Sequence, residues 1–72
     1  MITARRLRDT REDHDEYQKQ VAAVLKITPQ QYQLYESGQR KIPIDKLKIY
    51  CEHYNISADY MLGLIKEPKP IR

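Results

Sequence analysis

Apolar side chains recur along this chain at spacings of three and four residues, the period of one face of an α-helix. The clearest set is Ile44, Leu47, Cys51 and Tyr54, which predicts a helix after Pro43 with these four residues facing the core. Alternating β-branched runs and Asn-Gly or Asp-Gly turns do not occur, so the pattern predicts no strand. The expected fold class is all-α.

Residues that start and stop helices divide the chain into five short ones. Thr28 is suited to cap a helix, Pro29 to its first position and Gly38 to its end. Ser57 and Gly63 bracket a later helix in the same way. We expect helices over about residues 3–13, 18–25, 29–37, 44–54 and 58–62.

The length leaves room for one small domain. The 72 residues are 40% hydrophobic and 32% charged, so most apolar side chains must hold the fold and a deep enzyme pocket is not expected. We assign residues 1–64 to the domain and residues 65–72, with Pro68 and Pro70, to an extended C-terminal tail. No apolar run approaches a membrane span of roughly 20 residues, and the N-terminus does not resemble a signal peptide. We therefore expect a cytoplasmic protein without a membrane partner.

Residues that perform catalysis or bind metals are sparse. The one cysteine, Cys51, excludes an internal disulfide and lies on a predicted core face. His14 and His53 are far apart in the chain and have no ligand set around them, and Ser37 and Ser57 are interpreted as helix-end residues. We expect no enzymatic activity, metal, cofactor or small-molecule ligand.

Positive charge is concentrated in the middle of the chain. Between Tyr17 and Lys48 there are six basic and two acidic residues, a net charge of +4, whereas the remainder has seven basic and eight acidic residues. A basic segment in an otherwise balanced chain indicates a surface for a polyanion. An ordinary solvated surface would have the same composition.

Neutral amides crowd the predicted third helix. If Tyr32 and Tyr35 face inward, Gln30, Gln31 and Gln33 form its exposed face without a charge among them. A glutamine amide presents one donor and one acceptor, which matches the edge of adenine in the major groove. The residues alone leave two interpretations open: base reading, or a polar face that keeps the chain soluble.

The two central helices have the spacing of a helix-turn-helix, in which two short helices cross steeply around a tight turn. Ala22 is the informative residue, because a small side chain at the crossing lets the two backbones approach. The larger apolar side chains that fill the space behind it are Val21, Leu25, Ile27, Tyr32 and Tyr35.

Four segments, in order, resemble the phage-repressor and Cro-like helix-turn-helix family, also called the xenobiotic response element family. They are Gln18-Lys19-Gln20-Val21-Ala22, Tyr35-Glu36-Ser37-Gly38, Ile42-Pro43-Ile44 with Leu47, and Asn55-Ile56-Ser57-Ala58-Asp59-Tyr60-Met61-Leu62-Gly63. The resemblance covers about residues 6–64. It implies a five-helix, lambda-repressor-like DNA-binding domain whose third helix enters the major groove.

The resemblance also implies roles for individual residues. It favours base reading for the three glutamines, and a salt bridge from Arg11 to Glu36. By position, Gln18 would bind a phosphate and brace the recognition helix. Further phosphate contacts are expected from Lys19, Gln39, Arg40 and Lys41. Lys26 stands in the turn, where relatives often have glycine or asparagine; a positive φ there would cost about 1 kcal/mol.

The function implied is a sequence-specific, double-stranded DNA-binding transcriptional regulator, most simply a repressor that associates with the nucleoid when bound. We expect a homodimer on a two-fold symmetric operator, because one such domain contacts few base pairs. Its expected dimer surface is Ile56, Tyr60, Met61 and Leu64. Two alternatives stay open: an antitoxin-type regulator that also binds a toxin protein, and a helical protein-interaction module without DNA binding.

Overall fold

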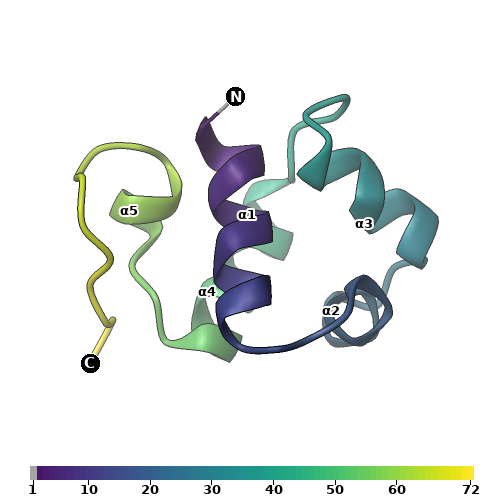
Figure 1. The fold of residues 1–72 in the computed structure, drawn as a ribbon, viewed down its shortest axis with the longest axis horizontal. Coiled ribbons are helices and arrows are strands. Elements are labelled where there is room, and N and C mark those ends of the chain that lie inside the picture. The colour runs from purple at the N-terminus through teal and green to yellow at the C-terminus, as the bar shows by residue number, and fades with distance from the viewer. Residues whose placement is uncertain (1) are drawn as a thin grey trace.

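The structure, a computed structural model, describes residues 2–72 and within them contains five helices and no strand. These are α1 (Ile2–Asp13), α2 (Gln18–Leu25), α3 (Pro29–Glu36), α4 (Ile44–Tyr54) and α5 (Ala58–Met61). In Figure 1, α1 runs through the middle of the molecule, with the α2–α3 pair on one side and α5 with the C-terminal segment on the other. The all-α prediction is confirmed.

Capping residues set the ends of α3 and α5 as predicted. The Thr28 hydroxyl accepts a hydrogen bond of 3.1 Å from the N–H of Gln31, and Pro29 occupies the first turn. The Ser57 hydroxyl accepts one of 3.0 Å from Asp59. Gly38, just beyond α3, has φ = 82°, a conformation that favours glycine. These residues fix where α3 begins and ends.

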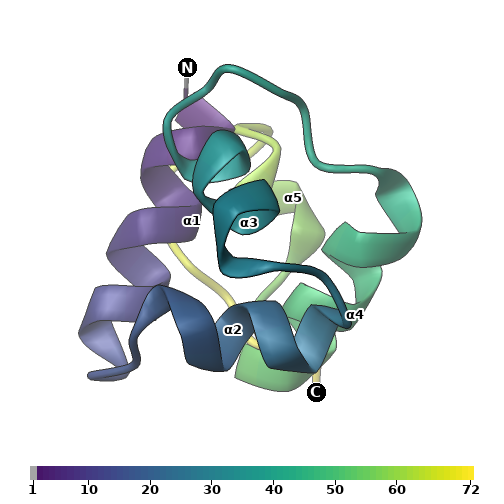
Figure 2. The ribbon, with the colours of Figure 1, turned by 90° about the vertical axis from the view of Figure 1, so that its right-hand side faces the viewer.

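Lys26 closes α2 in the left-handed conformation, with φ = 60°. The N–H groups of Lys26 and Ile27 donate to the carbonyls of Ala23 and Ala22, at 3.2 and 3.0 Å. The tight turn between α2 and α3 therefore requires a positive φ, at a cost of about 1 kcal/mol for lysine. With this turn, α2 and α3 cross steeply (Figure 2).

The core lies between the helices and contains the residues expected at the helix crossing except Ile27, which is partly buried and packs against it. Ala22 is 1% exposed, and the surrounding cluster includes side chains from every helix. Its members are Leu7, Val21, Ala22, Leu25, Tyr32, Tyr35, Leu47, Tyr50, Cys51, Tyr54, Ile56 and Met61. The small side chain of Ala22 thus lies in close-packed surroundings, which leave little room for a larger one.

The predicted core face of α4 is wrong at one position. Ile44 is 86% exposed, because it is the first residue of the helix and lies beyond the edge of the core. Tyr50, which the sequence analysis omitted, is fully buried instead. Its hydroxyl donates a 2.6 Å hydrogen bond to the carbonyl of Leu7 and so ties α4 to α1.

Two residues of the predicted dimer surface belong to the monomer core. Met61 is 0% exposed and Ile56 is 8% exposed, so neither is available to a partner. Thr10 is also buried, and its hydroxyl lies 3.9 Å from the Met61 sulfur. The short α5 turns inward here, and this corrects the expectation for both residues.

The segment 65–72 has no helix, but it folds back along the domain. The N–H of Ser57 donates to the carbonyl of Lys69 at 2.7 Å, and the Asn55 side chain accepts hydrogen bonds from the N–H groups of Ile71 and Arg72. The Arg6 guanidinium donates to the carbonyl of Ile65 at 2.9 Å and to that of Tyr60. It also lies 4.1 Å from the centroid of the Tyr60 ring. The tail is therefore docked along α5.

Candidate nucleic-acid interface

The outer face of α3 carries the three glutamines. Tyr32 and Tyr35 are 0% and 5% exposed, so they turn the opposite face of this short helix outward. Gln30, Gln31 and Gln33 are all exposed. The predicted arrangement of α3, with tyrosines inside and amides outside, is confirmed.

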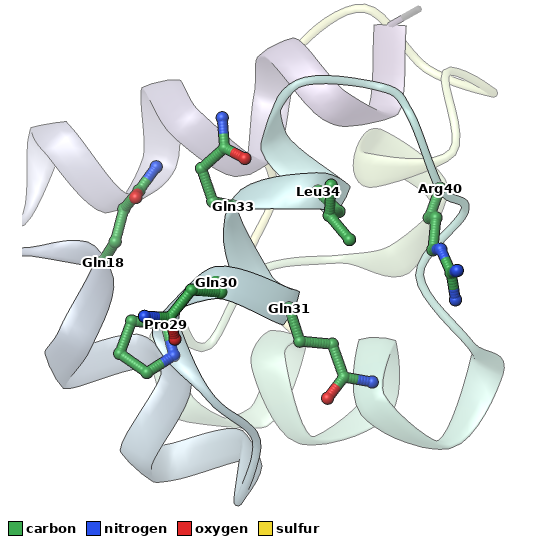
Figure 3. Close-up of a pocket in the computed structure, with 7 residues that line it drawn as sticks. All are labelled: Gln18, Pro29, Gln30, Gln31, Gln33, Leu34 and Arg40. Atoms are coloured by element: carbon green, nitrogen blue, oxygen red, sulfur yellow. The ribbon is translucent and has the colours of Figure 1, made fainter.

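A shallow hollow brings most of the predicted DNA-contacting residues together (Figure 3). It lies over α3 and is bordered by the start of α2 and by the loop after α3. Its lining consists of Gln18, Pro29, Gln30, Gln31, Gln33, Leu34 and Arg40. All three candidate base readers and two candidate phosphate contacts thus share one surface.

One of the glutamines is held by a neighbour. The side-chain amide of Gln31 donates a 3.3 Å hydrogen bond to the hydroxyl of Tyr35, one turn further along α3. A hydrogen bond of this kind restricts the rotamers of an otherwise flexible side chain and presents its remaining donor and acceptor in one direction. The Gln31 side chain is therefore partly fixed in orientation on the surface of α3.

Glu36, at the end of α3, receives hydrogen bonds from two other helices. The Arg11 guanidinium reaches its carboxylate at 2.7 and 3.1 Å, and Gln18 donates to it at 3.0 Å. The Glu36 side chain is 3% exposed. Burial alone would raise the pKa of Glu36, but the hydrogen bonds from Arg11 and Gln18 outweigh burial and lower it. The structure thus contains the expected ion pair.

This network orients Gln18 as well. Because its side-chain amide nitrogen donates to Glu36, Gln18 is held at the rim of the hollow while its backbone lies at the first residue of α2. The N–H groups of a helix N-terminus attract phosphate oxygens. Gln18 therefore begins α2 and also braces the end of α3. The bracing is a role that the resemblance implies for this residue.

Basic side chains surround the hollow without all lining it. The backbone N–H of Arg40 donates to the carbonyl of Leu34 at 3.1 Å, which brings the loop back to the end of α3 and places Arg40 at the hollow. Lys19 lines an adjoining hollow that shares Gln18 and Pro29. Lys41 lines a third hollow, with Arg40. Gln39 is exposed on the same loop.

The prediction of the outer face of α3 from the sequence named only its polar residues and left out Leu34. It is partly exposed and lines the hollow among the glutamines. Helical spacing could have placed Leu34 on the outer face, because it lies four residues after Gln30 and two after the inward-facing Tyr32.

An apolar surface adjoins this interface, because one of its hollows is the third hollow, which Arg40 and Lys41 also line. Two adjoining hollows share Ile44, Leu47 and Leu62, and one of them continues to Ile71. Ile44 and Leu62 are 86% and 52% exposed, and Ile71 is 45% exposed. Leu64 is 72% exposed but lines neither hollow. We call Ile44, Leu62 and Ile71 the apolar surface.

Within residues 2–72, no group of three or more His, Cys, Asp or Glu side chains is placed to bind a metal ion. None of the helices in that range has the length and apolar character needed to cross a membrane.

Burial raises the pKa of the Cys51 thiol to about 11, so this side chain is a neutral part of the core at pH 7.

Comparison with known proteins agrees with the fold. Over 65 residues the chain is 40% identical to a Bacillus subtilis (strain 168) protein named "Uncharacterized HTH-type transcriptional regulator YobD". The matched part is 90% of this chain and 58% of that relative's length. No solved structure shows significant similarity. Residues 7–61 match the family described as "Helix-turn-helix", and the chain belongs to this family.

Proposed function

We propose that the chain is a sequence-specific, double-stranded DNA-binding regulator of transcription. The observation that carries this proposal is the hollow over α3, in which three neutral amides lie between Gln18 and Arg40. The helix-turn-helix family and the name of the 40% identical relative support the same class of protein. Enzymatic chemistry has no support in this site.

The two kinds of side chain have different tasks in this proposal. The amides of Gln30, Gln31 and Gln33 each offer a donor and an acceptor to the adenine edge in the major groove. Gln18 and the N–H groups at the start of α2 bind one phosphate, and Arg40 binds another across the groove. Phosphate contacts then fix the register in which the glutamines meet the bases.

The protein acts as a homodimer that occludes a two-fold symmetric operator. The apolar surface supports this, because its rim carries Lys48 and Glu52, four residues apart on α4. When two copies meet across a two-fold axis with their α4 helices antiparallel, each Lys48 lies near the other copy's Glu52. Ile44, Leu62 and Ile71 replace the whole predicted dimer surface. Of its residues, Ile56 and Met61 are buried, Tyr60 packs against the Arg6 guanidinium, and Leu64 lines neither apolar hollow.

Sedimentation on operator DNA tests this dimer. Leu62→Asp places a charge in the apolar surface and is expected to leave a monomer, whereas Leu64→Asp, at an exposed leucine outside both hollows, is the matched control. Loss of the dimer in the control but not in Leu62→Asp would contradict the proposed surface.

DNA binding itself is tested by salt. Affinity for a mixed-sequence duplex is measured between about 50 and 200 mM salt. The logarithm of the affinity falls linearly with the logarithm of the salt concentration, and each phosphate contact contributes about 0.9 to the slope. A slope of several units is expected. A slope near zero, or no binding at low salt, would contradict DNA binding and favour a protein-interaction module.

A further inference from the structure

Leu34 is an apolar residue on an otherwise polar recognition face. At 3.6 residues per turn it lies one turn beyond Gln30, on the outward side of α3. In Figure 3 it lies between Gln33 and Arg40, and all three line the same hollow. The base-reading surface thus has an apolar patch within it.

Leu34 is not part of the hydrophobic core cluster. Within residues 2–72, Ile27, Ile42, Ile49 and Tyr60 are the partly buried apolar side chains that pack against the core cluster. Leu34 is not among them, although α3 contributes Tyr32 and Tyr35 to the cluster. The domain buries part of this side chain, and a ligand that covers the hollow would bury the apolar area that Leu34 still exposes.

The chemistry of the major groove offers one apolar group at base-pair level. Thymine carries a C5-methyl group there, beside the O4 acceptor, and its partner adenine carries the donor and acceptor that a glutamine amide matches. A leucine one turn from a glutamine is placed to cover a methyl group of the same or a neighbouring A·T pair. Cytosine and guanine have no such group.

We infer that Leu34 is a specificity-determining residue that packs on the C5-methyl group of a thymine in each half-site. The inference rests on the proposed DNA binding. It extends that proposal from hydrogen-bond reading by the glutamines to discrimination of thymine by its methyl group.

A uracil scan tests the contact in the DNA. The operator is first isolated from a randomised library, and each thymine is then replaced by uracil, which removes the methyl group and keeps every Watson–Crick hydrogen bond. Affinities are measured for the unchanged protein and for Leu34→Ala. Because the scan changes only the DNA, the protein fold is the same at every position.

One thymine per half-site is expected to respond. Burial of one methyl group at about 0.8 kcal/mol corresponds to a loss of about fourfold per half-site for the unchanged protein. The same uracil should leave the affinity of Leu34→Ala unchanged, which identifies Leu34 as the partner. The thymine should lie in or beside a base pair whose preference changes in Gln30→Ala or Gln33→Ala.

Two results would overturn the inference. Either no uracil changes the affinity of the unchanged protein, or the sensitive thymine is equally sensitive in Leu34→Ala. If Leu34→Ala does not fold, Leu34→Asn, which keeps the branched shape and removes the apolar character, takes its place in the same comparison. Failure of the proposed function is distinct, since the library would then return no preferred site.

Discussion

Arg11 and Glu36 form a two-point ion pair, with nitrogen–oxygen distances of 2.7 and 3.1 Å, that joins α1 to the last residue of α3. The Arg11 and Glu36 side chains are 11% and 3% exposed, so the pair is shielded from solvent. Gln18 donates to the same carboxylate. The end of the recognition helix is therefore held against α1 and α2 together.

Glu36→Gln is predicted to lower the free energy of unfolding by about 2 kcal/mol, because it removes the charge that Arg11 contacts. Urea unfolding at pH 7 measures this change. The matched control is Glu12→Gln, since Glu12 also approaches Arg11, at 3.8 Å, but its side chain is 58% exposed. Equal losses in the two variants would contradict a special role for the buried pair.

The same carboxylate predicts a dependence on pH. The pKa of Glu36 lies below its ordinary value of 4.5 in the folded chain, so the unfolded chain binds more protons as the pH falls below that value. The free energy of unfolding should then decrease from about pH 4.5 downward and be steady above it, as far as Glu36 contributes. Glu36→Gln should decrease less steeply over this range, and an identical slope would contradict the assignment.

Ala22→Leu is predicted to destabilise the domain by overpacking the crossing of α2 and α3. Ala22 is 1% exposed, and extra methylene groups in such a site cost about 1–3 kcal/mol. For a domain of this size, that lowers the melting temperature by at least about 4 °C. Ala23→Leu is the control at the exposed neighbouring position. An unchanged melting temperature in Ala22→Leu would contradict the close approach at Ala22.

Gln33→Ala is predicted to relax base preference with little loss of stability, since Gln33 is exposed on α3. A good amide–adenine pair discriminates by about 1–3 kcal/mol, so affinity for the preferred site should fall by about tenfold and affinity for other sequences should stay the same. Gln31→Ala should act similarly. Equal losses on every sequence would contradict base reading by these residues.

Arg40→Ala is predicted to weaken binding to all sequences alike, because a phosphate contact carries no base identity. The log–log slope of affinity against salt should fall by about one. Lys66→Ala removes the same charge from the C-terminal segment, outside the hollow over α3, and should leave the slope unchanged. A change of base preference in Arg40→Ala would contradict its assignment to phosphate.

Local signals in the sequence predicted the helices and the inward and outward faces of α3 well. Capping at Thr28 and inward spacing of Tyr32 and Tyr35 depend on residues near one another in the chain, and the structure contains all three features. Spacing on α4 also placed Ile44 on the core face. The spacing could not show that Ile44, the first residue of α4, lies beyond the edge of the core, because the extent of the core depends on which other elements cover the helix.

Long-range contacts are the part that could not be predicted. The burial of Met61, the hydrogen bond from Tyr50 to Leu7 and the docking of the tail on Asn55 join residues distant in the sequence. Helical periodicity predicts on which side of its own helix a residue lies, but it does not predict which residues of other helices that side contacts. Two of the four residues assigned to the dimer surface, Ile56 and Met61, are accordingly buried in the monomer.

Selection of bound duplexes from a randomised library, at near-physiological salt with the untagged protein, tests sequence-specific DNA binding most directly. We predict enrichment of a two-fold symmetric site whose half-sites are about one helical turn apart and contain A·T pairs where the glutamines lie. A folded protein that enriches no sequence would contradict the account.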